Sequence, residues 1–252
     1  MCIRDRLVSI SYVKNVNASQ VNEARLGWNR FAEGFFPQDK SFNPSSIGLD
    51  TGVTNPYDFG LPGIDVGSFS PIGATDSVPR SRVDANWHFI DNYSWKVGRH
   101  DVKFGYEFRR TTIQLIEDNS FRGSLSFNDL SDLLNGIVDG GGISGGDALR
   151  HTAENNHSVY IQDEFRMTAR LTVNYGMRWD YFGVVHEKNN LFYQMSPANG
   201  GTELQVGSPG GPSSLYNPDY NNFAPRVGLA YDITGKGETV IRAGWGLSLI
   251  HI

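Results

Sequence analysis

Residues 171–181 alternate between apolar and polar side chains without a break, and this pattern constrains the fold more than any other feature of the sequence. A β-strand has a side-chain period of two, so successive residues point to opposite faces of a sheet. The segment is therefore predicted to be a strand with one apolar face, and about 11 residues suffice to cross a membrane within a barrel. One face carries Leu171, Val173, Tyr175, Met177, Trp179 and Tyr181, and the other carries Thr172, Asn174, Gly176, Arg178 and Asp180.

Similar alternation recurs along the chain in pairs of segments that are joined by short, turn-forming sequences. Such pairs predict antiparallel β-hairpins. Four hairpins are expected, near residues 7–31, 84–116, 157–183 and 223–247, with turns at residues 17–19, 98–100, 168–170 and 234–237. Together they give about eight strands.

The connections between these hairpins are long and rich in Gly, Pro, Asn, Asp and Ser, and they comprise residues 32–83, 118–155 and 184–221. Loops of this length are unusual in a compact soluble domain, whereas outer-membrane barrels combine short periplasmic turns with long extracellular loops. We therefore predict an all-β fold, an antiparallel up-and-down meander of about eight strands that forms a sector of a transmembrane β-barrel with long extracellular loops. Within the second connection, residues 129–136 are expected to form a short helical turn and residues 140–146 a flexible loop tip.

The two faces of the predicted strands differ as lipid and a wet barrel interior require. Apolar faces with Trp and Tyr near the strand ends suit a lipid boundary, and faces with charged residues and glycine suit a lumen. The predicted lipid-facing residues are Trp87, Phe89, Tyr93, Trp95, Val102, Phe104, Tyr106, Phe108, Leu171, Val173, Tyr175, Met177, Trp179 and Tyr181. The predicted lumen-facing residues are Lys103, Glu107, Arg109, Glu164, Arg166, Asn174, Arg178 and Arg226. Asp163 is an exception, because its parity places a carboxylate on the apolar face, which indicates a bulge or a position outside the lipid band.

Charge and motif content argue against several function classes. The net charge of −5 disfavours a nucleic-acid-binding protein, which would need a basic face. Asp163 and Glu164 are adjacent in a predicted strand and point to opposite faces, so they cannot act as a catalytic carboxylate pair. Glu164 is instead expected to form a ladder of opposite charges with Arg166 and Arg178. No catalytic, cofactor-binding or metal-binding residue is assigned, no cofactor is expected, and the chain is not expected to be an enzyme.

Four segments, in this order, resemble a known family. Residues 21–27 (VNEARLG), 98–110 (GRHDVKFGYEFRR), 161–179 (IQDEFRMTARLTVNYGMRW) and 222–232 (NFAPRVGLAYD) are similar to segments of Oar-like TonB-dependent outer-membrane receptors. The resemblance covers most of residues 7–246. It implies a barrel of about 22 strands in the bacterial outer membrane, plugged by an N-terminal domain and energised by the TonB complex.

The chain is accordingly interpreted as part of such a receptor. Residues 7–246 are expected to be a partial barrel without a plug domain, so outer-membrane lipid is a direct partner and the TonB complex a partner only through an N-terminal part of the parent protein. The expected function is binding and import of an unknown large solute. Residues 1–6 and 247–252 are expected to be non-native tails. Two alternatives stay open: a soluble secreted β-sandwich that binds or hydrolyses carbohydrate, with its aromatic residues stacking on sugars, and a passive porin.

Overall fold

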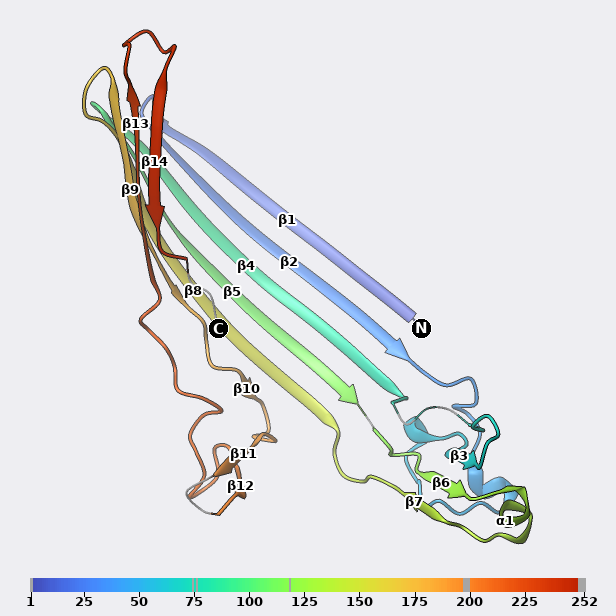
Figure 1. The fold of residues 1–252 in the computed structure, drawn as a ribbon. Coiled ribbons are helices and arrows are strands. Elements are labelled where there is room, and N and C mark those ends of the chain that lie inside the picture. The colour runs from blue at the N-terminus through green and yellow to red at the C-terminus, as the bar shows by residue number, and fades with distance from the viewer. Residues whose placement is uncertain (1, 74, 76, 118, 197–199, 249–252) are drawn as a thin grey trace. The chain divides into compact units, whose positions relative to one another are not determined.

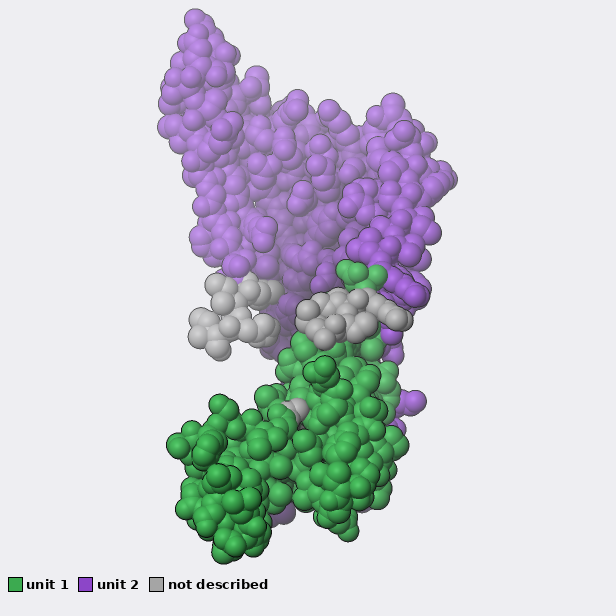
Figure 2. Space-filling view, turned by 90° about the vertical axis from the view of Figure 1, so that its right-hand side faces the viewer, with its two compact units in different colours: residues 1–5, 31–84, 113–151 green, residues 6–30, 85–112, 152–252 purple. Residues whose placement is uncertain are grey.

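The computed structural model describes residues 2–73, 75, 77–117, 119–196 and 200–248, and the chain divides into two compact units. The loop unit comprises residues 1–5, 31–84 and 113–151, and the sheet unit comprises residues 6–30, 85–112 and 152–252, as Figure 2 shows by colour. Met1 and residues 249–252 of the predicted tails lie outside the described residues, and Cys2–Arg6 belong to the first strand.

Eight strands form one sheet whose spatial order follows their order in the chain, β1-β2-β4-β5-β8-β9-β13-β14 (Figure 1). The pairings of β8 with β9, β9 with β13 and β13 with β14 are antiparallel, and neighbours in the sheet follow the order of the chain, so the predicted up-and-down meander is confirmed. The strands are β1 (Cys2–Asn17), β2 (Gln20–Phe35), β4 (Arg80–Val97), β5 (His100–Glu117), β8 (Leu149–Arg166), β9 (Leu171–Tyr181), β13 (Phe223–Asp232) and β14 (Val240–Gly246). A ninth strand, β10 (His186–Glu187), pairs with β8 beside this path.

Short turns join the strands of each hairpin at the positions that the sequence predicts. The turn between β4 and β5 has only two residues, and Gly98 adopts a φ of 59°, which glycine reaches without steric cost. Between β8 and β9, the Thr168 Oγ1 atom accepts hydrogen bonds from the backbone N–H groups of Arg170 (3.1 Å) and Leu171 (3.0 Å). In the last hairpin, the Asp232 carboxylate accepts from the N–H groups of Gly235 (2.9 Å) and Gly237 (2.8 Å). Local polar contacts of this kind fix the register of each hairpin.

Several strands extend beyond the predicted hairpins. β4 begins at Arg80, and β8 begins at Leu149, inside the connection that was predicted to reach residue 155. The predicted boundaries are wrong here because the extensions carry polar residues on both faces and so lack the apolar alternation from which strands were predicted.

The first two long connections fold into the loop unit instead of remaining structureless. A small sheet contains β3 (Gly63–Val66), β6 (Ser124–Phe127) and β7 (Gly140–Gly142), with β3 parallel to β6 and β6 antiparallel to β7. The expected flexible loop tip at residues 140–146 is therefore wrong for Gly140–Gly142, which pair through backbone hydrogen bonds that need no side chains. Val66 and Phe127 are the buried apolar side chains of this sheet.

Short helices complete the loop unit. The expected helical turn is confirmed as α1 (Leu130–Asn135), with the Asp129 carboxylate accepting from the Asp132 N–H at 2.9 Å and Gly136 in the left-handed region at its end. Two 3-10 helices, η1 (Pro44–Ile47) and η2 (Pro56–Asp58), begin with proline after the capping residues Asn43 and Asn55. No helix among the described residues is long and apolar enough to cross a membrane.

An ion pair joins the first two connections within the loop unit. The Nη2 atom of Arg122 lies 2.9 Å from both carboxylate oxygens of Asp39, and the Arg122 side chain is only 4% exposed. Asp39 also accepts from the backbone N–H of Leu61 at 2.7 Å. Arg122 occupies the space beside Gly60, where a Cβ would overlap its guanidinium group.

The third connection forms a small hairpin of its own. β11 (Tyr193–Ser196) pairs antiparallel with β12 (Thr202–Gln205), and this pair makes a separate two-stranded sheet. Val206, directly after β12, is buried. All three long connections therefore contain regular structure.

Candidate functional site

The aromatic residues predicted to face lipid share one face of the main sheet. On β4 and β5, the rings of Tyr93 and Phe104 stack with centroids 5.2 Å apart, and Phe89 lies 6.4 Å from Tyr106. The register of β8 and β9 places the apolar residues of the two strands opposite one another, with Ile161 opposite Met177. The sheet thus assembles the separate apolar stripes into one surface, called here the aromatic face. Its predicted members are Trp87, Phe89, Tyr93, Trp95, Val102, Phe104, Tyr106 and Phe108, with Leu171, Val173, Tyr175, Met177, Trp179 and Tyr181. Strand register adds Ile161, Val227 and Trp245 to the same face.

The aromatic face is not covered by other parts of the sheet unit that the structure describes. Trp87 is 50% exposed and Trp245 is 63% exposed, and aliphatic residues between the rings, such as Ile161, are equally open. Among the described residues, the buried hydrophobic side chains are Val66, Phe127, Val206 and Ala224, none of which belongs to this face. A soluble β-sandwich buries the apolar face of each sheet against the other, so this arrangement disfavours the sandwich alternative.

Polar groups on the aromatic face are paired with one another. Asp163 is 8% exposed, and its Oδ2 atom lies 2.6 Å from both the Nδ1 atom of His100 and the hydroxyl of Tyr175. The His100 ring also stacks on Phe165 at 4.3 Å. On β2 and β4, the Asn22 amide donates to the Asp91 carboxylate at 2.6 Å. Such pairing lowers the cost of placing polar groups on an apolar surface.

The opposite face, called here the polar face, carries a network of charged groups from four strands. The carboxylate of Glu107 on β5 lies 2.8 Å from His88 Nε2 on β4 and 3.1 Å from Arg178 Nη2 on β9. Arg178 also donates from Nε to Asp180 at 2.9 Å, and Asp180 accepts from the Ser158 hydroxyl of β8. The sheet thereby fixes the guanidinium of Arg178 between two carboxylates.

The charge ladder expected around Glu164 is corrected by this network. The carboxylates that pair with Arg178 are those of Glu107 and Asp180, and not that of Glu164. The cause is strand register: Glu164 lies opposite Asn174, whereas Tyr160 lies opposite Arg178. The large phenol of Tyr160 donates to Asn92 at 2.8 Å and covers Gly105, where a Cβ would lie 2.6 Å from its ring.

Two adjoining hollows occupy the polar face. One has a volume of about 570 Å³ and the other a volume of about 340 Å³, and both are bordered by Arg178, Ala224 and Arg226. Predicted lumen residues line them, with Lys103, Glu164, Asn174, Arg178 and Arg226 at the first and Glu107, Arg109, Arg178 and Arg226 at the second. Arg166 lies on the same alternation, opposite Thr172. Hollows of this size lined by charged groups can bind a polar solute.

Comparisons with known proteins agree with this architecture. Residues 3–252 match the family described as "Outer membrane beta barrel domain". A solved structure titled "Copper transporter OprC" is similar with a TM-score of 0.50 and 13% sequence identity, and the match covers 97% of this chain and 30% of that chain. This chain therefore spans less than a third of that protein, and the likeness concerns the fold. A comparison with curated protein sequences gave no match. The chain belongs to the outer membrane beta-barrel domain family, and its location is the bacterial outer membrane.

Proposed function

We propose that residues 7–246 form part of the barrel of an Oar-like TonB-dependent receptor that binds and imports a large solute. The observation that carries the proposal is the exposed aromatic face, because a large apolar surface of this kind is stable in contact with lipid. The opposite face of the same sheet carries hydrogen-bonded charged groups, as the interior of a barrel does. The four sequence segments that resemble Oar-like receptors lie in the meander at β2, at the turn before β5 and in β5, from β8 to β9, and at β13.

The proposal gives the two kinds of connection different roles. The short turns face the periplasm, and the long connections, which contain the loop unit and the β11 to β12 hairpin, face outward and meet the solute. The predicted lipid-facing and lumen-facing residues keep those roles, with the polar face lining the interior. Energy coupling through the TonB complex involves an N-terminal part of the parent protein.

The localisation part of the proposal is tested in the parent protein expressed in a bacterial host. The barrel is expected in the outer-membrane fraction, with electrophoretic migration that changes on heating. Recovery in the soluble fraction, without heat-modifiable migration, would contradict the proposal and favour the soluble sandwich.

Energy coupling is tested in the same host by comparing solute uptake before and after deletion of the TonB component. The proposal expects uptake to stop, while binding of the solute at the cell surface persists. Uptake that continues at an unchanged rate would favour a passive porin. A porin of the same strain is the control, because its transport does not need the TonB complex.

A further inference from the structure

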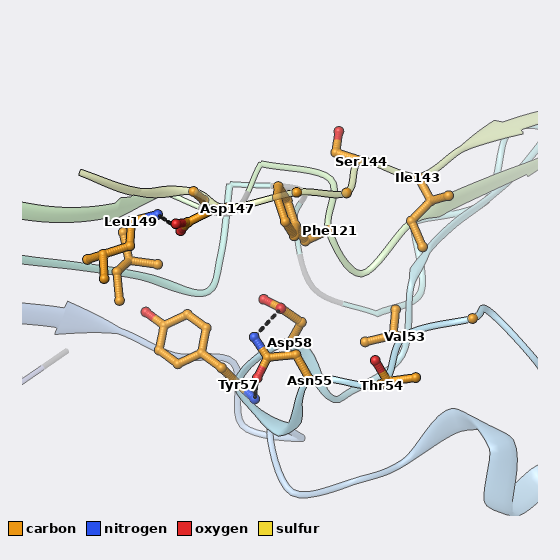
Figure 3. Close-up of a pocket in the computed structure, with 15 residues that line it drawn as sticks. Val53, Thr54, Asn55, Tyr57, Asp58, Phe121, Ile143, Ser144, Asp147 and Leu149 are labelled. Carbon is orange, nitrogen blue, oxygen red and sulfur yellow. Dashed lines mark hydrogen bonds between the residues drawn. The ribbon is translucent and has the colours of Figure 1, made fainter. Parts of the chain in front are cut away.

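A cavity lies entirely within the loop unit, between the first two long connections (Figure 3). Its volume is about 420 Å³, which lies within the range of small-molecule sites. One wall is formed by residues 52–58 around η2, and the other by Ile116, Phe121 and residues 143–149. Segments far apart in the sequence therefore enclose it.

The carboxylate of Asp58 in this cavity has one buried oxygen without a hydrogen-bond donor from the described part of the chain. Asp58 is 3% exposed, and its Oδ2 atom accepts from the Asn55 amide at 3.0 Å. Its Oδ1 atom is buried and has no hydrogen-bond partner among the described residues. Figure 3 shows this carboxylate directed toward the space between Tyr57 and Asp147. A buried carboxylate oxygen without a donor is costly, so a bound group with an N–H or O–H donor would stabilise it.

The remaining lining groups indicate the charge of that bound group. Asp147 adds a second carboxylate at the exposed edge of the cavity, where one of its oxygens accepts from the Leu149 N–H at 2.9 Å. Among the described residues, no Lys, Arg or His lines the cavity. The described lining thus carries two carboxyl groups and no cationic side chain, which favours a cation over a neutral donor such as a sugar hydroxyl.

The apolar walls of the cavity indicate which kind of cation fits it. Apolar side chains of Val53, Phe121 and Leu149 form much of the lining, together with the ring of Tyr57, whose hydroxyl lies 3.2 Å from the Ser81 hydroxyl. Ca²⁺ takes six to eight oxygen ligands, and the described residues contain no group of three or more metal-ligating side chains. An organic cation with an apolar body matches these walls better than a bare metal ion does.

We infer that the loop unit binds a small organic cation here, with a primary ammonium group on Asp58 and an apolar portion against Val53, Tyr57 and Phe121. The ammonium donates to the free Oδ1 atom of Asp58, and the hydrocarbon part leaves water by filling the apolar part of the cavity. The inference names a ligand class for the long connections. Its role in solute uptake rests on the proposed receptor function, whereas binding itself rests on the cavity alone.

The test measures binding of 2-phenylethylammonium to the full chain in detergent micelles by isothermal titration calorimetry. Saturable binding is expected for this probe, and much weaker binding for 2-phenylethanol, which has the same ring and no charge. Asp58→Asn is expected to weaken binding by about 10-fold to 100-fold, since it removes a charge-assisted hydrogen bond. Asp50→Asn removes the same charge from an exposed position in the same connection, and it should leave the affinity unchanged.

A second variant covers the case in which Asp58→Asn disturbs the loop. Val53→Trp should fill the cavity and abolish binding while keeping the carboxylate, and hydrogen exchange of residues 143–149 reports whether the loop unit stays folded. The inference would be overturned by absence of saturable binding of 2-phenylethylammonium or by equal affinity for 2-phenylethanol. Unchanged affinity in both cavity variants, or competition by Ca²⁺ at equal concentration, would overturn it as well. Because binding is measured on the purified chain, its failure is distinct from a failure of TonB-dependent uptake.

Discussion

A lysine at Val227 provides the sharpest test of which face of the sheet meets lipid. Val227 lies on β13, opposite Tyr175 on one side and Trp245 on the other, and it is 46% exposed. The aromatic residues Phe223 and Tyr231 lie on the same alternation, four positions to each side. At about 3.3 Å per residue and a tilt of about 40°, they are separated by roughly 20 Å along the membrane normal, close to the apolar band of a barrel.

This geometry puts Val227 near the middle of the bilayer if the aromatic face is the lipid face. A lysine at that depth costs about 2 to 4 kcal/mol, which lowers the folding equilibrium constant by about 30-fold to 900-fold. The measurement is the free energy of unfolding of the chain reconstituted in phospholipid vesicles, obtained by denaturant titration with tryptophan fluorescence.

The adjacent residue supplies a matched control. Gly228 points to the polar face, borders the larger hollow there, and has only an ordinary 3.5 Å contact for a Cβ, with the carbonyl oxygen of Ala243. Gly228→Lys should therefore change the free energy of unfolding by less than about 1 kcal/mol. If the two lysines cost the same, or if Gly228→Lys costs more, the assignment of the two faces is wrong.

Three further predictions concern the packing of each unit. Gly105→Ala should destabilise the chain by about 1 to 3 kcal/mol, because its Cβ would lie 2.6 Å from the Tyr160 ring and 2.8 Å from the Asp91 carbonyl oxygen, whereas Gly228→Ala should be nearly neutral in the same denaturant titration. A double-mutant cycle of Glu107→Gln and Arg178→Met should give a coupling energy below about 1 kcal/mol, since both side chains are partly exposed to water; a coupling above about 3 kcal/mol would contradict this. Asp39→Asn should leave the Arg122 charge buried and cost about 3 kcal/mol in the loop unit, seen as faster proteolysis of residues 32–73, and unchanged proteolysis would show that the ion pair does not hold the unit together.

The main sheet was predictable because its information is local. Alternation places Val173 and Met177 on one face whatever their neighbours are, and a turn such as Gly98-Arg99 brings the next segment back beside the first. The extensions of β4 and β8 were not predictable in this way. Their polar residues adopt the strand conformation because neighbouring strands continue, and a sequence pattern does not record that influence.

The cavity in the loop unit illustrates the same limit for a site. Asn55-Pro56-Tyr57-Asp58 is a typical turn sequence, in which an aspartate is normally exposed. Asp58 is buried in a unit where Ile116, Phe121 and residues 143–149 line the same cavity. The pairing of β3 with β6 that brings these connections together joins residues about 60 positions apart. A carboxylate in a turn carries no signal of such long-range burial, so the structure was needed to identify it.

Asp163 shows how parity and tertiary contacts combine at one residue. Its place on the apolar alternation left two explanations, a bulge or a site outside the lipid band. Continuous register through Asp163 opposite Tyr175 and Glu164 opposite Asn174 makes the bulge explanation wrong. The carboxylate is tolerated there because His100, the first residue after the β4 to β5 turn, and Tyr175 both donate to it at 2.6 Å. A polar group can thus lie on the aromatic face where neighbouring side chains supply hydrogen-bond donors to it.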